Sequence, residues 1–192
     1  MARYGKEHKE ATERRIIEAA GPRLKRDGID GSGVAVLMAD AGLTNGAFYA
    51  HFASKDDLVA TVVADQLRQQ LERYRERAVD RAGVEQLVRE YLSIEHRHDT
   101  AHGCPSAALL DEIGRCSKTT KQAYTDGVLG LVDQIASILA PGDPQSARGQ
   151  TLSLFALLIG TLQLSRALSD RRLADEVLER GTDNALALLP SE

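Results

Sequence analysis

Residues 33–58, GVAVLMADAGLTNGAFYAHFASKDDL, decide the fold class of this chain. Early in this stretch apolar side chains recur three and four positions apart, which is typical of one face of a short helix; they are Val34, Leu37, Met38 and Ala41. Gly42 follows the last of them, and a glycine in that place can adopt the left-handed conformation that closes a helix. The stretch therefore predicts a short helix and then a tight turn.

Two more helices are expected directly after this turn. The first covers residues 45–51, with the Thr44 hydroxyl as its N-cap and with Phe48 and Phe52 on one buried face. Ser54 is suited to cap the next helix, because acidic residues follow in its first turn. Short helices joined by a glycine turn predict a helix-turn-helix, so DNA is the first partner to consider.

Residues 41–55, AGLTNGAFYAHFASK, resemble the N-terminal signature of the TetR/AcrR family of bacterial repressors. The positions that carry the resemblance are Gly42, Thr44, Gly46, Tyr49, Phe52, Ser54 and Lys55. The specific match covers residues 12–60, and the rest of the chain agrees in length and helical character. The family often has threonine and polar residues where Gly33, Ala35 and Val36 stand, so backbone contacts from that helix do not carry over. A basic residue is common where Asn45 stands, so base preference does not carry over either.

The resemblance implies a ligand-responsive DNA-binding regulator, most commonly a repressor, with activation as the alternative. It also implies a double-stranded, palindromic operator and a small-molecule effector that is not identified. The side chains expected at DNA are Thr44, Asn45, Gly46, Ala47, Tyr49, His51 and Lys55. Among these, Tyr49 and Lys55 are expected chiefly at phosphates.

The distribution of charge is compatible with DNA binding. The net charge is -4 and the pI is about 5.8, but residues 1–57 carry nine basic and nine acidic side chains. Residues 1–26 hold eight Lys or Arg against four Glu, which predicts a basic arm near the DNA backbone. Its candidate phosphate contacts are Lys6, Lys9, Arg14 and Arg15, which could equally form a solvated helix face.

The rest of the sequence indicates helices, and no run alternates as a strand would. Expected helices are one ending at Asp27-Gly28, then residues 54–78, 84–95, 105–115, 117–139, 144–168 and 171–188. The predicted fold is all-α with about nine helices. Residues 1–53 form a helix-turn-helix DNA-binding domain, and residues 54–192 form a helical effector-binding and dimerisation domain. We expect a cytoplasmic protein without membrane contact, because no signal peptide or spanning segment is evident.

Homodimerisation is expected through residues 145–188. Apolar side chains cover more than one face between Leu152 and Leu168, and Gly160 would let a second helix approach closely. A buried central helix in a monomer is the alternative. A dimer would place two recognition helices about 34 Å apart, the spacing of successive major grooves.

Residues 96–109, HRHDTAHGCPSAAL, are the second cluster of interest. Pro105 suits the first position of a helix, so Cys104 would lie at its N-cap, where the helix dipole and His102 would favour a thiolate. A similar segment occurs in some TetR/AcrR members, including electrophile-responsive ones. The alternative is a small buried hydrophobic residue. We place an effector pocket between Tyr91 and Tyr124, with Cys104 and His102 as candidate sensing residues.

Metal or redox sensing is the alternative function for this cluster. Its candidate residues are His96, His98, His102, Cys104 and Cys116, whose spacing matches no standard zinc motif. A regulatory disulfide between the two cysteines is a further alternative, although a short helix separates them. We expect no resident cofactor or metal and no enzyme activity, because no phosphate-binding loop or nucleophile motif is found.

Overall fold

The computed structural model describes the backbone of residues 2–190 and the side chains of residues 7–190. Regular structure in these residues is helical throughout, which confirms the all-α prediction. The elements are α1 (Ala2–Asp27), α2 (Val34–Asp40), the 3₁₀ helix η1 (Asn45–Ala50), α3 (Lys55–Arg77), α4 (Arg81–Tyr91), α5 (Ile94–His98), α6 (Pro105–Ile113), α7 (Lys118–Leu139), α8 (Pro144–Ala167) and α9 (Arg171–Ala187). None of these helices is long and apolar enough to cross a membrane.

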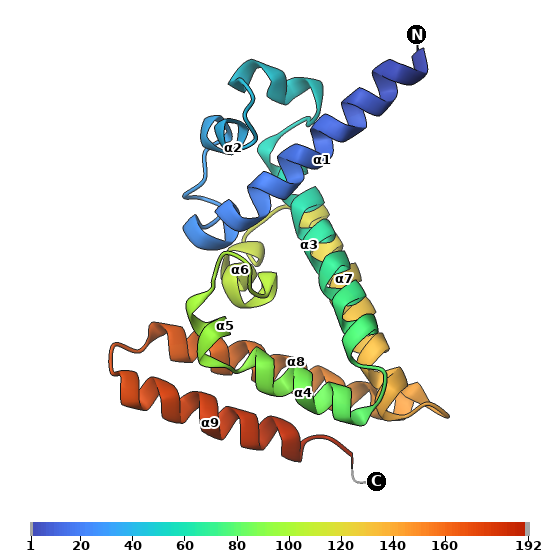
Figure 1. Ribbon diagram of the computed structural model, residues 1–192, viewed down its shortest axis with the longest axis vertical. Helices are drawn as coiled ribbons and strands as arrows, with labels where there is room; N and C mark the ends of the chain where they lie inside the picture. Colours follow the sequence, from blue (N-terminus) through green and yellow to red (C-terminus); the bar gives the residue numbers. More distant parts are fainter. Residues whose placement is uncertain (1, 191–192) are drawn as a thin grey trace.

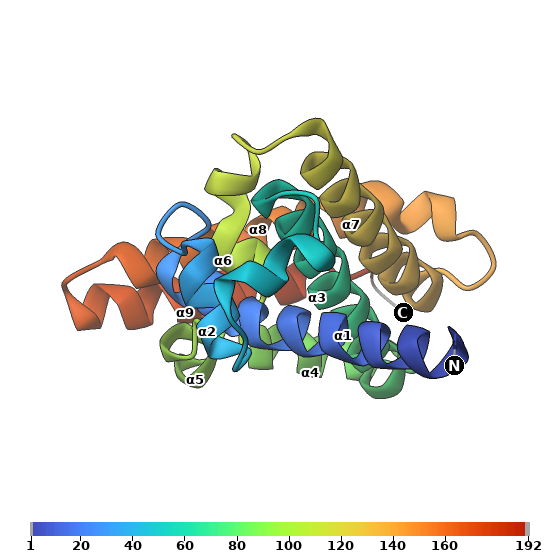
Figure 2. The same cartoon turned by 90° about the horizontal axis from the view of Figure 1, so that it is seen from above.

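The elements form two ends joined by a long pair of helices. In Figure 1, α1 and α2 lie at the top, while α4, α8 and α9 lie at the bottom. The joining helices α3 and α7 run side by side between the two ends, and seen from above α1 crosses in front of α3 (Figure 2). α3 therefore spans the molecule from η1 to α4.

The upper end is built on its own hydrophobic core. Ile16 and Leu24 of α1, Leu37 of α2, Phe48 of η1 and Leu58 of α3 are completely buried in it. Leu109, Ile113 and Leu131 from α6 and α7 join the same cluster. Truncating a residue buried like Phe48 to alanine typically costs about 3–5 kcal/mol, so the fold of this end depends on these few side chains.

Close contact between α3 and α7 depends on a glycine. A Cβ atom built on Gly127 would lie 2.6 Å from Cδ1 of Leu67, which is fully buried in α3. Three residues along α7, a Cβ on Gly130 would lie 3.4 Å from Leu71, an ordinary contact. The packing of α7 on α3 therefore leaves no room for a side chain at Gly127.

The pair α8 and α9 leaves one surface open. A Cβ on Gly181 would clash with Thr161, so these helices pack tightly against each other. On the other side of α8, a Cβ on Gly160 would meet nothing within 4 Å, and Leu164 is 52% exposed. The apolar residues between Leu152 and Leu168 thus face both the core and the outside, as their sequence distribution predicts.

The structure differs from the predicted helices in three places. The expected helix over residues 84–95 is broken, because the Ser93 hydroxyl accepts a hydrogen bond from the His96 N–H (3.1 Å) and so begins α5. This break makes ten helical segments in the described residues instead of nine. The expected recognition helix is a 3₁₀ helix. The Thr44 hydroxyl makes no capping hydrogen bond to it, contrary to prediction.

Candidate functional site

The turn between α2 and η1 has the predicted geometry. Gly42 has a φ of 66°, the left-handed conformation that favours glycine, and its N–H donates to the carbonyl of Ala39 (2.9 Å). The next N–H, of Leu43, donates to the carbonyl of Met38 at 2.9 Å. These two bonds close α2 in the manner of a Schellman motif and direct the chain into η1.

Two stacked phenylalanines fix the orientation of η1. The rings of Phe48 and Phe52 lie 5.8 Å apart, and both side chains are buried. The Tyr49 ring meets Phe48 edge to face at 5.2 Å, yet Tyr49 is 75% exposed. Burial of one edge of η1 therefore leaves the opposite edge, with Tyr49, at the surface.

The residues expected at DNA are divided between exposed and half-buried positions. Thr44, Asn45, Gly46 and Tyr49 are exposed, whereas Ala47, His51 and Lys55 are half-buried. A Cβ on Gly46 would meet nothing within the protein, so the missing side chain serves no internal packing. The Nδ1 atom of His51 is buried and has no hydrogen-bond partner among the described residues.

The start of α3 is held by a reciprocal cap. The Asp57 N–H donates to the Ser54 hydroxyl (3.1 Å), and the Ala53 N–H donates to the Asp57 carboxylate (3.0 Å). This confirms Ser54 as the N-cap. It also fixes the backbone next to Lys55, the candidate phosphate contact.

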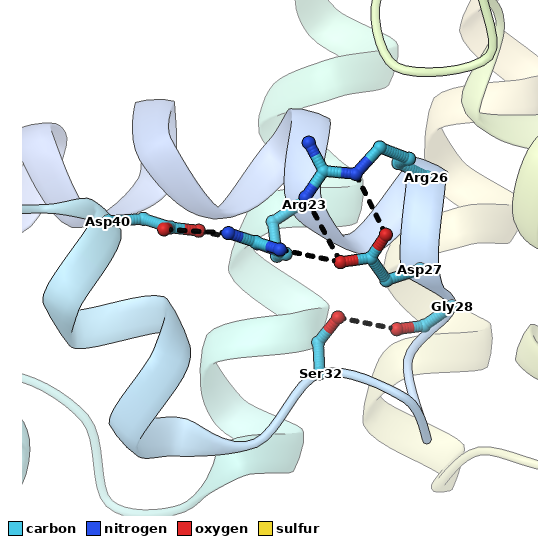
Figure 3. A network of polar contacts seen from close by, with 6 residues as sticks. All are labelled: Arg23, Arg26, Asp27, Gly28, Ser32 and Asp40. Carbon is cyan, nitrogen blue, oxygen red and sulfur yellow. Dashed lines mark hydrogen bonds and ion pairs between the residues drawn. The ribbon is translucent and has the colours of Figure 1, made fainter.

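A salt bridge between α1 and α2 braces this end of the molecule. Arg23 donates to both carboxylate oxygens of Asp40 (2.6 and 2.9 Å) and to Asp27 (2.7 Å), and Arg26 also pairs with Asp27 (Figure 3). The two arginines hold the pKa of Asp27 well below its usual range. Sequence reasoning missed this brace, because residues 17 positions apart carry no local signal of pairing.

The basic arm is only partly described. Lys9, Arg14 and Arg15 are on α1, in positions that allow either a phosphate contact or a solvated helix face. The side chain of Lys6 lies outside the described residues.

Residues 16–62 match the family model described as bacterial regulatory proteins, tetR family. This match assigns the DNA-binding end of the chain, residues 16–62, to the TetR family. The match covers α2, the glycine turn, η1 and the start of α3, where the sequence resemblance lies.

Solved structures share the fold of this chain over nearly its whole length. The reduced form of E. coli NemR has a TM-score of 0.79 at 19% identity, covering 95% of this chain and 98% of that one. A TetR-family regulator from Agrobacterium tumefaciens has a TM-score of 0.75 at 19% identity, covering 95% and 100%. FadR from Bacillus subtilis, in complex with stearoyl-CoA, has a TM-score of 0.61 at 19% identity, covering 92% and 97%. No curated protein matches the chain. Identities this low establish the fold alone.

A cleft of about 200 Å³ lies between α3, α4 and the loop before α6. It gathers three of the four predicted sensing residues, Tyr91, His102 and Cys104. Tyr124, the fourth, is not among its lining residues and packs against the upper core instead. Sequence reasoning missed the α3 side of the cleft, whose polar residues are Gln70, Arg73, Tyr74 and Arg77.

Cys104 is the N-cap residue of α6, as predicted, but its neighbours differ from the prediction. His96, not His102, accepts a hydrogen bond from the Cys104 N–H, through Nε2 at 3.0 Å. Nδ1 of His96 lies 2.6 Å from the Tyr91 carbonyl oxygen. These two bonds fix a neutral imidazole with its proton on Nδ1, and burial lowers the pKa of His96. His102 is exposed and pairs with Asp99 at 2.9 Å.

The Cys104 thiol contacts a polar side chain of α3. The residue is 4% exposed, and Sγ lies 3.7 Å from the side-chain amide of Gln70, to whose oxygen it donates. The amide nitrogen of Gln70 donates to the Tyr74 hydroxyl (2.8 Å). The Tyr91 hydroxyl is buried nearby and has no hydrogen-bond partner in the described part of the chain. Burial and the neighbouring thiol raise the pKa of Tyr91 well above its ordinary value.

Two cations, the buried Lys25 and the half-buried Arg166, lie behind the cleft. Lys25 of α1 is 6% exposed and donates to the carbonyl of Gly103 (3.0 Å), and burial lowers the pKa of Lys25 to about 8. Arg166 of α8 donates to three backbone carbonyls, those of His96, Arg97 and Ala107. Lys25 thereby links α1, and with it the DNA-binding end formed by α1, α2 and η1, directly to the residue before Cys104.

A second link joins α6 to the turn after α1. The Glu112 carboxylate accepts a hydrogen bond from the Asp30 N–H (2.9 Å). Gly28 has a φ of 81°, and a Cβ atom built on it would lie 2.7 Å from Oε1 of Glu112. The helix that begins at Cys104 is therefore joined at both its ends to the DNA-binding end.

The residues of the metal hypothesis do not form a ligand set. Within residues 7–190, no group of three His, Cys, Asp or Glu side chains is placed to hold an ion. Both ring nitrogens of His96 are occupied by backbone groups, and His102 faces Asp99. Cys104 and Cys116 are free thiols that belong to different clusters of packed side chains.

Proposed function

We propose that this chain is a homodimeric TetR-family repressor that binds a palindromic operator and is released when its Cys104 cleft is occupied or modified. The observation that supports DNA binding most is the edge of η1, where Tyr49 is exposed directly above the buried Phe48. Phosphate contacts from Tyr49 and Lys55 would position η1, and Asn45 would read bases. Residues 1–53 would form the DNA-binding domain and residues 54–192 the effector and dimerisation domain, in the cytoplasm.

Dimerisation would use the open surface of α8 and α9. Leu152, Leu164 and Leu173 are each at least 40% exposed on these helices, and Gly160 leaves room for close approach. Exposed apolar side chains are typical of protein interfaces. Two copies joined there would each present one η1 to the same DNA duplex.

Communication with DNA would run through α3 and α6. Gln70 and Arg73 in the cleft lie on the same helix as Lys55 at the DNA-binding end. The bonds from Lys25 to Gly103 and from Asp30 to Glu112 couple α6 to α1 and its turn. A ligand that fits the cleft better in one arrangement of these helices would favour that arrangement and change the spacing of the two η1 elements.

A separate apolar cavity between α3, α4, α7 and α8 supports a second candidate for the effector site. It is lined by Val84, Leu131, Phe155 and neighbouring apolar residues, but its volume is only about 30 Å³, room for about two waters. The FadR structure holds stearoyl-CoA, and an acyl chain would have to open this cavity. We favour the Cys104 cleft, because it is already open and carries polar groups.

Selection from genomic DNA tests the proposal. The purified, reduced protein is incubated with fragments of its own genome at physiological salt, and the retained fragments are sequenced. We expect a shared inverted repeat, and loss of enrichment when Tyr49 is replaced by alanine, a change at an exposed position that removes no buried contact of the core. Retention of fragments without any shared sequence would contradict operator binding.

Replacement of each cysteine tests the sensing step. Cys104→Ser should bind the same operator but should no longer be released by oxidants or electrophiles. Cys116→Ser is the matched control, since it removes the other thiol of the chain and should respond normally. Normal release of the Cys104→Ser protein would return Cys104 to a structural role.

A further inference from the structure

The charges around the Cys104 cleft are unbalanced. Arg73 and Arg77 line it from α3, and Glu90 lines it from α4. Arg77 and Glu90 pair with each other at 2.5 Å. Arg73 is exposed at the same opening, and the described structure gives it no carboxylate partner. One guanidinium at the mouth of the cleft is thus available for an anion.

The groups behind the cleft have the same sign. Lys25 and Arg166 donate only to backbone carbonyls in the described residues, so each keeps its positive charge without a carboxylate partner. Asp99 is the acidic group on this side, and it accepts hydrogen bonds from the backbone and the ring of His102. The lining therefore carries Arg73, Arg77 and Glu90, while Lys25, Arg166 and Asp99 lie behind it, which makes four cationic side chains against two carboxylates. A cleft with such walls concentrates small anions.

The floor of the cleft offers an unused hydrogen bond. The Tyr91 hydroxyl is buried in a residue that is 6% exposed, and it has no partner in the described structure. Tyr91 and Cys104 line the cleft together with the apolar side chain of Leu87. A ligand that reaches this floor needs an acceptor atom for Tyr91 and an uncharged body beside Leu87.

We infer that the Cys104 cleft binds small organic carboxylates, with the carboxylate on Arg73 and the uncharged end against Tyr91 and Cys104. A guanidinium binds a carboxylate through two parallel hydrogen bonds, which makes Arg73 the group that selects this class. This inference names the ligand class of the effector site and so rests on the proposal that the cleft is that site.

Cys116 provides an internal comparison, because the charged side chains around it are mainly acidic. Burial, Asp56, Asp30 and Glu112 together raise the pKa of Cys116. An anionic reagent should therefore be attracted to Cys104 and repelled from Cys116 within the same molecule.

Paired alkylation with iodoacetate and iodoacetamide tests the inference on the full chain without DNA. In both reactions the thiolate sulfur forms a bond to the reagent's methylene carbon, iodide leaves with the electron pair of the C–I bond, and the thiol proton goes to buffer. Mass spectrometry of the digested protein gives the rate at each cysteine. We expect the iodoacetate-to-iodoacetamide rate ratio to be about tenfold higher at Cys104 than at Cys116, and to fall as salt screens the cations.

Two variants identify the cation responsible. Arg73→Gln should lower the ratio at Cys104 and leave the ratio at Cys116 unchanged. Arg75→Gln is the matched control, because it removes the same charge from the same helix but Arg75 contacts Gln134 instead of the cleft. Unfolding would expose both cysteines and make their ratios equal, so loss of structure is distinguished from loss of the site.

A reversible probe tests binding itself. Benzoate should slow alkylation of Cys104 by iodoacetamide, and benzamide, its uncharged analogue, should not. Equal ratios at the two cysteines, equal protection by the two probes, or no alkylation at Cys104 would each overturn the inference. None of these alkylation measurements uses DNA, so they can be interpreted even if operator selection fails. Release from DNA by neutral electrophiles only would overturn the carboxylate class and leave the proposed function standing.

Discussion

Lys25, near the end of α1, donates a hydrogen bond to the carbonyl of Gly103, 78 residues further along the chain. The lysine is withdrawn from solvent, and no carboxylate among the described residues pairs with its ammonium group. The contact joins the helix that supports the DNA-binding end to the loop that carries Cys104. Its consequences for stability and for signalling can be measured separately.

Replacing Lys25 by methionine should change how stability depends on pH. The pKa of Lys25 is about 8 in the folded protein and is lowered from 10.5 by burial. The unfolded chain therefore binds more protons between these values, and the free energy of unfolding of the wild type should rise with pH across this window. Lys25→Met should lack that rise, which we expect to be on the order of 3 kcal/mol. Urea unfolding between pH 7 and about 10.5 measures it.

Lys9→Met is the control for this experiment, because Lys9 is exposed on the same helix. It should keep the wild-type pH dependence. An identical rise in Lys25→Met would show that the lysine is not buried as described.

His96→Gln should make the protein less sensitive to acid. Burial lowers the pKa of His96, so the unfolded state takes up a proton first as the pH falls below about 6.5, and stability is lost there. Glutamine can keep the bonds to the Tyr91 carbonyl and the Cys104 N–H without titrating. The urea midpoint of the wild type should therefore fall relative to that of the variant as the pH is lowered from about 7.5 to 5.5. His102→Gln, at an exposed position, should not produce this change.

Substitutions on η1 and α3 should separate phosphate contacts from base contacts. Tyr49→Phe and Lys55→Ala should weaken binding to every DNA sequence. Lys55→Ala should also reduce the slope of log K against log salt by about 0.9, the value for one phosphate that is no longer neutralised. Asn45→Ala should mainly relax base preference. Fluorescence titrations on operator and scrambled DNA at several salt concentrations measure both effects. Equal weakening on all sequences by all three variants would refute the division.

Leu164→Glu should weaken the dimer. This leucine is 52% exposed on α8, and a carboxylate there would be buried against a second copy at high cost. Sedimentation velocity should show monomer at micromolar concentration, and operator affinity should fall with it. Val79→Glu places the same charge at a 77% exposed valine between α3 and α4 and should leave the mass unchanged. A dimeric Leu164→Glu protein would exclude this surface from the interface.

Two glycines of α7 should respond to alanine in opposite ways. At Gly127 the new Cβ would lie 2.6 Å from Leu67, so the helices must separate, and overpacking of this kind typically costs about 1–3 kcal/mol. At Gly130 the nearest side-chain atom is 3.4 Å away, so the higher helix propensity of alanine should stabilise the protein by up to about 1 kcal/mol. Thermal unfolding of the two variants provides the comparison. Stabilisation by both would show that α3 and α7 are less closely packed at Gly127 than described.

The sequence was a sufficient guide wherever the signal was local. The conformation of Gly42, the capping role of Ser54 and the buried pair Phe48 and Phe52 depend on neighbours within a few positions, and all were predicted. The N-cap position of Cys104 follows in the same way from the proline after it.

Contacts between distant residues could not be predicted from these patterns. Lys25 gave no sign that it would be buried against Gly103, because its neighbours on α1 include other charged residues. The histidine beside Cys104 is His96 and not the predicted His102. Ser93 caps α5 directly after α4 ends, and α5 places His96 against the Cys104 N–H. The 3₁₀ form of η1 was also missed, since the spacing of Phe48 and Phe52 suits a turn of either helix type.

The claim that the Cys104 cleft controls the DNA-binding end is tested most directly by operator affinity before and after one defined modification. The Cys116→Ser protein is alkylated at Cys104 with iodoacetamide, confirmed by mass, and titrated against the selected operator, with the Cys104→Ser, Cys116→Ser protein treated identically as the control. We predict that the alkylated protein binds about fivefold more weakly or worse, within the usual range of coupling between sites, while the control is unchanged. Equal affinity of the alkylated and untreated proteins would contradict any coupling between the cleft and the DNA-binding surface.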